Sequence, residues 1–326
     1  MIKISENALV CAFSINARGQ AKTLSSDEIQ TRSKTKQWKW IHLDRTAEET
    51  APWLCDTANV PTIATNALLA EETRPGLKEF SEGHVINLRG INLNADASQE
   101  DMVAIRLWVT PDQVISLRRY KLMADQDLRD KYENGLGPKT IGNFISELCH
   151  GLTQRISNKL SDLEESLDLL EEAAIEKPSA KQRNEVMDIR RKAIPLKRFL
   201  FPQRDALEEL SRLNVKWLST TDKEHIREAY HQLSRIIEAL DAFKERATLL
   251  QEELTNLSAE VANNNTYVLT IVAAIFLPLG FLTGLLGINV GGVPGTENPW
   301  AFAIVCLLMI IIGVIEVIIL KWLKWI

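Results

Sequence analysis

The last part of this 326-residue sequence contains an uncharged stretch that is long enough to cross a membrane. From Val261 to Thr296 there is no Asp, Glu, Lys, Arg or His. Hydrocarbon offers no partner to free backbone N–H and C=O groups, so such a stretch has to cross as a helix. Tyr267–Leu286 supplies roughly the 20 apolar or small residues that one crossing needs, and Pro299–Leu320 supplies a second. The sequence therefore predicts a membrane protein with two C-terminal transmembrane helices.

Composition separates this apolar end from the rest of the chain and excludes several classes of protein. The mean hydropathy of -0.09 averages a charged part up to about residue 260 with an apolar part beyond it. A net charge of -5 argues against a nucleic-acid-binding protein, which normally carries a basic face. No Walker loop, dinucleotide fingerprint or nucleophile–base motif is present, so we expect neither an enzyme nor a bound cofactor.

The charges that flank the two spans predict the topology. The connection Ile288–Asn298 contains no Lys or Arg, whereas Lys321 and Lys324 follow the second span together with two tryptophans. Positive residues favour the cytoplasmic side, and tryptophan favours the membrane interface. We therefore expect the C-terminus in the cytoplasm and, after two crossings, the N-terminus there as well. Widely spaced cysteines without a Cys-x-x-Cys pair agree with a reducing compartment.

The first 140 residues have the pattern of an α/β domain with a mixed sheet. Short runs rich in Val, Ile, Leu and Trp predict strands, and the third and fourth of these form a hairpin around the polar segment Asn94–Asp101. Two helices are expected at Ala47–Ala58 and Thr62–Glu72. The predicted strands are Leu9–Phe13, Trp38–Leu43, Val85–Leu93, Met102–Val109 and Val114–Leu117.

Helices dominate after Gly135, Gly137 and Pro138. The first is expected at Ile141–Glu176, and the next begins with a capping box of Ser179 and Gln182. Pro195 and Pro202 are expected to kink or interrupt it, because each removes a backbone donor.

Another capping box, Thr221 with Glu224, predicts the start of a helix that runs without Gly or Pro up to Pro278. Apolar residues repeat along it by fours and threes. A helix from Asp222 to Leu286 would be about 100 Å long and would extend from the bilayer as a stalk.

Two helices per subunit cannot enclose an aqueous pore, so the chain is expected to form a ring with the first span inside. Residues that fall within one stripe of about 100° on that span are polar at one end, apolar in the middle and small at the other. They are Asn263, Thr266, Thr270, Ala273, Leu277, Gly280 and Gly284. Gly280 and Gly284 also suit close helix packing, which is compatible with a ring.

Three further groups of residues bear on ion transport. Gly287-Ile288-Asn289, at the outer end of the first span, offers carbonyl and amide oxygens at a pore mouth. Glu316, in the second span, is expected to pair with a basic neighbour or snorkel, with a functional acid as the alternative. An acidic run could concentrate cations, or could be a solvated helix face: Asp162, Glu164, Glu165, Asp168, Glu171, Glu172 and Glu176.

At these residues the chain resembles the CorA family of divalent-cation transporters, which has two C-terminal spans and a Gly-x-Asn signature after the first. Leu277-Pro278-Leu279 resembles the apolar-Pro-Leu segment of the family. The chain is similar in particular to the zinc-associated ZntB subgroup. The features that carry this similarity are Ile288 in place of Met, the acid-free loop 291–295, Arg190-Arg191, Leu196–Leu200, Pro202-Gln203-Arg204-Asp205, Glu72–Pro75 and Leu88–Asn92.

This resemblance implies a funnel-shaped homopentamer in the bacterial inner membrane that transports divalent metal cations, with zinc as cargo. It places Asn289 at the outer mouth, where it would hold a hydrated ion, Asn263, Thr266 and Leu269 at the cytoplasmic entrance, and Leu277 at the central constriction. The expected segments are an α/β domain (1–140), a helical hairpin (141–221), a stalk (222–266), a pore-lining span (267–286), an external loop (287–298), a second span (299–320) and a basic tail (321–326).

The residues themselves leave the metal open. Neutral oxygens discriminate poorly among divalent ions, the stripe contains no His or Cys, and the five histidines form no spaced pair. A Mg²⁺, Co²⁺ or Ni²⁺ channel of the same architecture is therefore one alternative. A non-conducting membrane scaffold is another, and coupling to protons also stays open.

Overall fold

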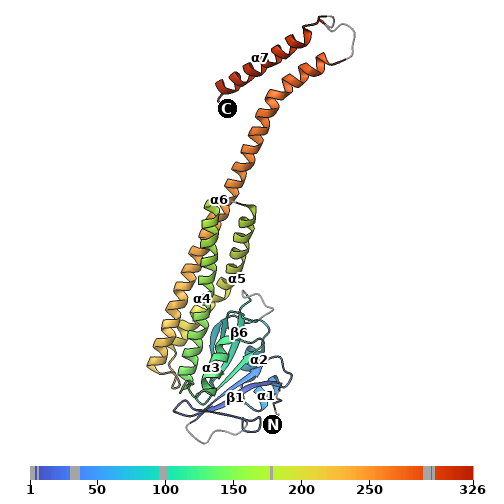
Figure 1. Cartoon of the computed structure of the whole chain (residues 1–326). Helices are drawn as coiled ribbons and strands as arrows, with labels where there is room; N and C mark the ends of the chain where they lie inside the picture. Colours follow the sequence, from blue (N-terminus) through green and yellow to red (C-terminus); the bar gives the residue numbers. More distant parts are fainter. Residues whose placement is uncertain are drawn as a thin grey trace. The chain divides into compact units, whose positions relative to one another are not determined.

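The computed structural model describes residues 4–5, 7–29, 37–94, 101–176, 179–288, 295 and 298–325. The chain forms two compact units (Figure 1). The first comprises Met1–Lys177 and Lys181–Gln251, and the second comprises Pro178–Ala180 and Glu252–Ile326.

The first unit contains a seven-stranded mixed sheet, as the sequence predicts. The strand order is β2-β1-β3-β7-β6-β5-β4, in which β3 and β7 are parallel and the other neighbours are antiparallel. The expected hairpin is confirmed as β5 and β6, whereas β2 and β4 were not predicted. The strands are β1 (Leu9–Ile15), β2 (Ala21–Thr23), β3 (Trp38–Asp44), β4 (Gly76–Glu79), β5 (His84–Gly90), β6 (Val103–Val109) and β7 (Gln113–Arg118).

Two short helices, α1 (Thr50–Asp56) and α2 (Thr62–Leu69), pack with one face of the sheet around a buried apolar core. Trp53, Leu68 and Trp108 belong to this core and are at most 1% exposed. Both helices are shorter than predicted. At the end of α2, Arg45 and Arg106 donate hydrogen bonds to the carbonyls of residues 68–70, so side chains satisfy the carbonyl groups that another helical turn would otherwise bond.

A third helix, α3 (Met123–Glu133), was not predicted. It packs on α4 (Ile141–Glu176), and α4 also contacts β5. Strand β5 ends before the predicted Leu93. Gly90 closes the strand where a Cβ atom would come within 2.7 Å of the side chains of Leu122 and Leu152, so the close approach of these segments requires glycine there.

Helix α5 (Ala180–Arg212) begins directly after Ser179 and continues through both prolines, so of the two expected effects, a kink or an interruption, the interruption is wrong. Gln203, in the Pro-Gln-Arg-Asp segment of α5, has a structural role. The side chain, 1% exposed, accepts a hydrogen bond from Arg89 N (2.7 Å) and donates one to Arg89 O (3.0 Å). Strand β4 pairs with β5 only up to Asn87. At Arg89, the next residue of β5 whose N–H and C=O point to that side, the side chain of Gln203 takes the place of the missing strand.

Helix α6 (Thr220–Leu286) is one helix of 67 residues. Its capping box lies two residues before the predicted pair: Ser219 Oγ accepts from Asp222 N (3.2 Å), and Asp222 Oδ2 accepts from Ser219 N (3.0 Å). Within the first unit the expected apolar seam is buried at Ile226, Leu233 and Leu240. The apolar repeat stays buried at Leu250 and Leu254, whereas Val261, in the second unit, is 57% exposed in the single chain.

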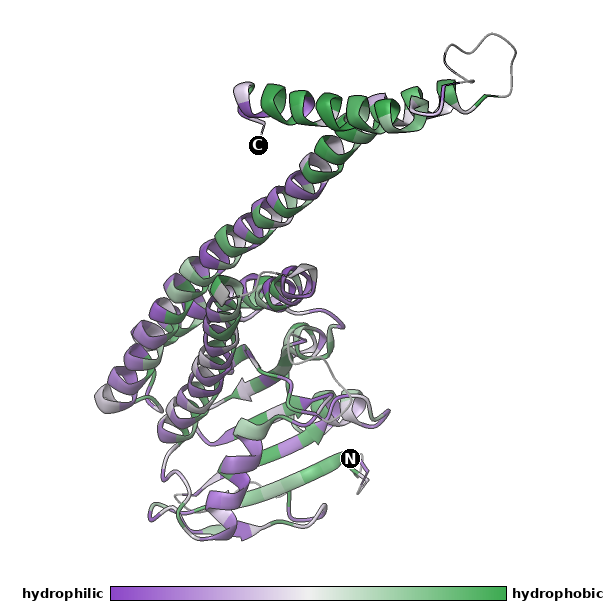
Figure 2. Ribbon diagram, turned by 45° about the horizontal axis from the view of Figure 1, so that its top comes forward, coloured by the Kyte–Doolittle hydropathy of each residue, from purple (hydrophilic) through white to green (hydrophobic). Residues whose placement is uncertain are grey.

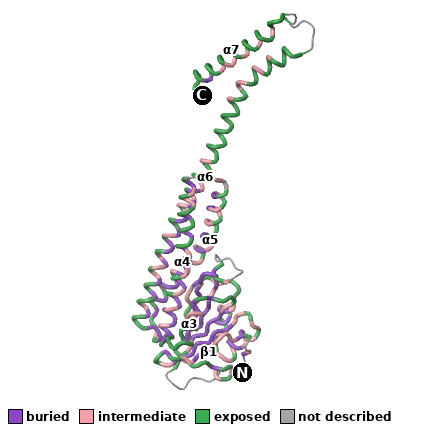
Figure 3. The backbone as a smooth tube through the Cα atoms, viewed as in Figure 1, coloured by how far each residue is buried: buried purple, intermediate pink, exposed green. Residues whose placement is uncertain are grey.

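In the second unit, the part of α6 from Tyr267 to Leu286 and helix α7 (Ala301–Trp322) are almost entirely apolar, whereas α6 is mostly polar from Glu252 to Thr266 (Figure 2). Both contain a stretch long and apolar enough to cross a membrane, and hardly any residue of these stretches is buried (Figure 3). Soluble proteins rarely leave so large a contiguous apolar surface uncovered. These helices match the two predicted spans, although α7 starts and ends two residues later than expected.

Candidate ion-conduction site

The stripe predicted to line a pore lies on the second-unit part of α6. All of its members are exposed at the surface of the single chain: Asn263, Thr266, Thr270, Ala273, Leu277, Gly280 and Gly284. Leu269 is 68% exposed and Leu277 is 72% exposed. The stripe is therefore free to face water or another copy of the chain.

The threonines of the stripe are held in a defined orientation by their own helix. Thr266 Oγ1 donates to Ala262 O (3.0 Å), and Thr270 Oγ1 donates to Thr266 O (2.8 Å). Each hydroxyl thereby uses its only proton inside the helix and keeps its oxygen lone pairs for an outside donor. Water in the first shell of a cation is such a donor, so this part of α6 can accept hydrogen bonds from a hydrated metal ion.

Pro278 lies inside α6 without ending it. After it, Gly280 and Gly284 leave open space, because a Cβ atom added at either position would meet no atom within 4 Å. Neither glycine is therefore required by packing within one chain. Their small size serves either a passage along the helix or a close approach by another helix.

The Gly-Ile-Asn signature follows the end of α6. Gly287 N donates to Thr283 O (3.0 Å), which is the last helical bond, and Ile288 is 50% exposed. Asn289, the expected ligand for a hydrated ion, lies outside the described residues. Gly287 and Ile288 directly follow the apolar end of α6, and their place at a pore mouth stays a prediction.

The acid of the second span, Glu316, is half-buried in α7. One of its carboxylate oxygens, Oε2, is buried without a hydrogen-bond partner, and no ion pair joins it to Lys321 or to any other basic residue that the structure describes. The expected pairing is thus not observed in the single chain.

The acidic run occupies α4. Arg246 of α6 lies 2.6 Å from both Asp168 Oδ1 and Glu171 Oε2, and these hydrogen bonds raise the pKa of Arg246. Two of the acids are therefore neutralised by an ion pair. Among the described residues, no ion pair involves the carboxylates of Asp162, Glu164, Glu165 or Glu172, which leaves these four for cations in solution.

No group of three or more His, Cys, Asp and Glu side chains suited to a metal ion occurs within the part of the chain that the structure describes. His42 contacts two side chains that lie far from it in the sequence, so the spacing of the histidines does not reveal its partners. Its Nδ1 lies 2.6 Å from Ser116 Oγ, and its Nε2 lies 3.0 Å from Asp125 Oδ2.

This Ser116–His42–Asp125 arrangement resembles the order of a hydrolytic triad, which the sequence analysis missed because the three residues lie far apart in the chain. Ser116 is fully buried and its Oγ accepts a hydrogen bond from Trp40 Nε1 (2.8 Å). A nucleophile must reach its substrate, and this hydroxyl does not reach the surface. His42 and Ser116 lie in the sheet and Asp125 on α3, where Asp125 Oδ2 also lies 3.3 Å from a guanidinium nitrogen of Arg118, so the three residues form a buried polar contact between α3 and the sheet.

The two exposed apolar helices and the exposed, graded stripe on α6 define a membrane protein. The family described as "CorA-like Mg2+ transporter protein" matches residues 35–322, and the chain belongs to this family. The chain is 36% identical to the "Divalent cation transporter CmaX" of Pseudomonas aeruginosa, over 98% of this chain and 97% of that one. It is 34% identical to the "Zinc transport protein ZntB" of Pectobacterium atrosepticum, over 95% and 94% of the two chains.

A solved structure of full-length CmaX superimposes with a TM-score of 0.86 at 34% identity, covering 99% of this chain and 100% of that one. The recognition made from the Gly-x-Asn signature and the two spans is therefore confirmed, as is the fold class of a mixed sheet with helices, a very long helix and an apolar C-terminal helix.

Proposed function

We propose that this protein transports divalent metal cations across a membrane, with Zn²⁺ as cargo, through a central pore of a homopentamer. The observation that carries the proposal is the exposed α6 stripe, polar at Asn263–Thr270 and small at Gly280–Gly284, in a chain that matches CorA-family proteins along nearly its whole length. A helix that served only as an anchor would need no such gradation.

The chemistry of the stripe suits ions that keep their water. Removing the first shell of a divalent cation without anionic ligands is too unfavourable, and Mg²⁺ in particular dehydrates reluctantly. The Thr266 and Thr270 oxygens, together with the Asn289 amide, would accept hydrogen bonds from bound water. Leu277 would form the apolar constriction, and Gly287 would offer a carbonyl oxygen at the mouth.

The choice of Zn²⁺ rests on the relatives, since the stripe holds no His or Cys. Several similar proteins are named zinc transport proteins, while CmaX is named only as a divalent-cation transporter. Transport of Mg²⁺, Co²⁺ or Ni²⁺ is the second candidate, because neutral oxygen ligands accept all of these hydrated ions.

The assembly and topology belong to the same proposal. Five copies would surround the pore in a bacterial inner membrane, with both termini in the cytoplasm, and the unpaired acids of α4 would raise the local cation concentration. Mass spectrometry of the detergent-solubilised protein under native conditions should show pentamers. A dominant monomer or dimer across mild detergents would remove the pore.

The test of transport is metal flux into proteoliposomes that contain a zinc-sensitive dye. Zinc influx down its gradient is expected, and a parallel series with Mg²⁺, Co²⁺ and Ni²⁺ as competitors ranks the cargo. An imposed pH gradient that changes the zinc flux would add proton coupling. Absence of flux for all four metals, with pentamers intact, would favour the membrane scaffold.

A further inference from the structure

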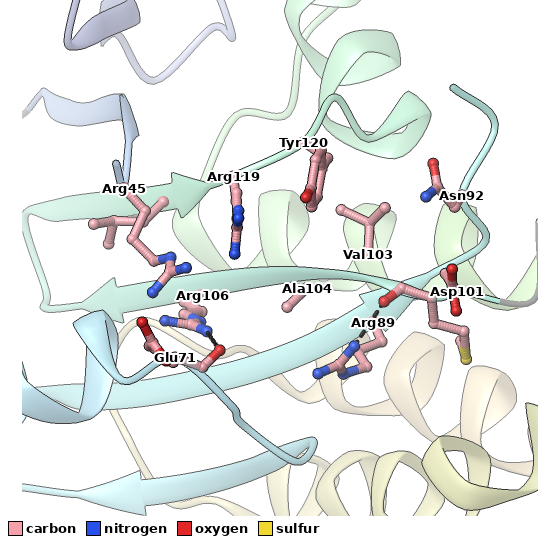
Figure 4. Close-up of a pocket in the computed structure, with 12 residues that line it drawn as sticks. Arg45, Glu71, Arg89, Asn92, Asp101, Val103, Ala104, Arg106, Arg119 and Tyr120 are labelled. Carbon is pink, nitrogen blue, oxygen red and sulfur yellow. Dashed lines mark hydrogen bonds between the residues drawn. The ribbon is translucent and has the colours of Figure 1, made fainter. Parts of the chain in front are cut away.

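A pocket of about 500 Å³ lies on the sheet of the first unit, beyond the end of α2. Four arginines line it, together with two acidic side chains, Glu71 and Asp101. Figure 4 shows Arg45, Arg106 and Arg119 gathered at one end beside Glu71, with Arg89 at the other end near Asp101. The transport proposal gives this cluster no role.

The fold places these arginines on one face of the sheet. Arg106 of β6 has the same orientation as Ala104, which pairs in register with Arg89 of β5. Arg119 directly follows β7, and Arg45 directly follows β3, the parallel neighbour of β7. Each of four adjacent strands, or the residue that directly follows it, therefore contributes one guanidinium group. The four groups are brought together by the sheet.

Backbone carbonyls hold the arginines of β5 and β6. Arg106 is 4% exposed and donates to Leu68 O (2.6 Å) and Glu71 O (3.3 Å). Arg89 donates to Met102 O (2.6 Å) and Thr73 O (2.9 Å), and its guanidinium stacks 4.0 Å above the ring of Phe199. These contacts fix the guanidinium groups but supply only partial charges.

No carboxylate forms an ion pair with any of the four arginines among the residues that the structure describes, although the charge of Glu72 lies near enough to Arg89 to oppose the lowering of its pKa by burial. Burial, together with the nearby positive charges of Arg45 and Arg89, lowers the pKa of Arg106 to about 10. At neutral pH Arg106 nevertheless stays charged. Buried charges in proteins are normally paired, so this cluster lacks an anion.

We propose that this pocket binds a phosphate-bearing small molecule. The planar guanidinium fork matches phosphate oxygens in geometry, and the volume lies in the range of small-molecule pockets, well above what a single halide ion needs. Arg119 is exposed and forms no hydrogen bond or ion pair with any described residue, so its donors are free for the ligand. Its guanidinium lies 5.3 Å from the ring centre of Tyr120, which is 52% exposed at the rim and offers a face for stacking.

Isothermal titration calorimetry of the full-length protein in detergent tests this directly. The probes are inorganic phosphate and ADP, titrated with EDTA present so that no metal carries the phosphate to the protein. Both probes are expected to bind, and ADP more tightly because it has two phosphates and a base. Absence of binding at millimolar concentrations would overturn the proposal.

Variants show whether the pocket is the site. Arg119→Gln should weaken ADP binding about tenfold, as expected for one lost charge-assisted hydrogen bond, while Arg119→Lys, which keeps the charge without the fork, should fall between. Arg227→Gln changes an exposed arginine on α6 outside the pocket and should bind ADP as the wild type does. Equal affinity of all four proteins, or displacement of ADP by an equal concentration of chloride, would contradict the assignment.

Discussion

Substitution of Gly284 by leucine separates a passage from a mere anchor. In the single chain a Cβ at Gly284 meets nothing within 4 Å, so the side chain has room. Replacing a helical glycine by leucine also removes an intrinsic penalty of about 1 kcal/mol. Considered alone, one chain carrying Gly284→Leu should therefore be at least as stable as the wild type.

In a ring the same change has a different consequence, because one isobutyl group from each subunit enters the stripe. If these groups remove even one hydrogen bond made by the hydrated cation, about 1.5–3 kcal/mol is lost. A barrier higher by about 1.4 kcal/mol slows passage tenfold. Zinc flux through Gly284→Leu should thus fall at least tenfold in proteoliposomes.

The matched control is Gly313→Leu on α7, where an added Cβ also meets nothing within 4 Å. This variant should keep the wild-type flux, because α7 is the outer helix of the proposed ring. Equal flux through both variants, with the same oligomeric state, would refute the placement of the stripe on a pore. So would a loss confined to Gly313→Leu.

Three further predictions concern the first unit. Gln203→Leu leaves the N–H and C=O of Arg89 unpaired and should destabilise the protein by about 2–4 kcal/mol, seen as a lower Tm, whereas Gln154→Leu on the exposed side of α4 should not; an unchanged Tm for Gln203→Leu would contradict the role of that side chain. Burial raises the pKa of the Cys149 thiol to about 12, so a variant with Cys149 as its single cysteine should resist maleimide at pH 7.5 until denatured, and rapid labelling of the native protein would show the thiol to be accessible. Burial lowers the pKa of His84 from its ordinary 6.5, so the stability it provides is complete above about pH 6.5 and declines as the pH falls towards the lower folded-state pKa; Tm should drop more between pH 7.5 and 5.5 in the wild type than in His84→Gln, and parallel curves would exclude this contribution.

Much of the architecture follows from local pattern. Ile141–Glu176 was predicted with the bounds that the structure shows, because a long amphipathic run between Pro138 and Pro178 leaves no other end points. The two spans could also be predicted from the sequence, because an uncharged stretch of membrane length can cross a bilayer only as a helix. The stripe follows from the helical spacing of residues on the first span.

The elements that the sequence did not predict depend on contacts between residues that lie far apart in the chain. The four residues of β4 form a strand only because β5 lies beside them, and α2 ends early because Arg45 and Arg106 bind its last carbonyls. The arginine pocket was invisible for the same reason: its members come from four strands, and no spacing in the sequence joins them. The sequence pointed to the pocket only through charged residues inside predicted strands, such as Arg89 and Arg106.

In the proposed ring, divalent cations pass the membrane by way of Gly287-Ile288-Asn289. The most direct measurement is zinc flux through purified Asn289→Ala and wild-type protein in proteoliposomes, after native mass spectrometry has shown that both are pentamers. Each subunit of the variant loses one acceptor for the hydrated ion, worth about 1.5–3 kcal/mol, so the flux should fall at least tenfold. Wild-type flux through an intact ring of Asn289→Ala would mean that this segment only ends the helix and that the ion is selected elsewhere.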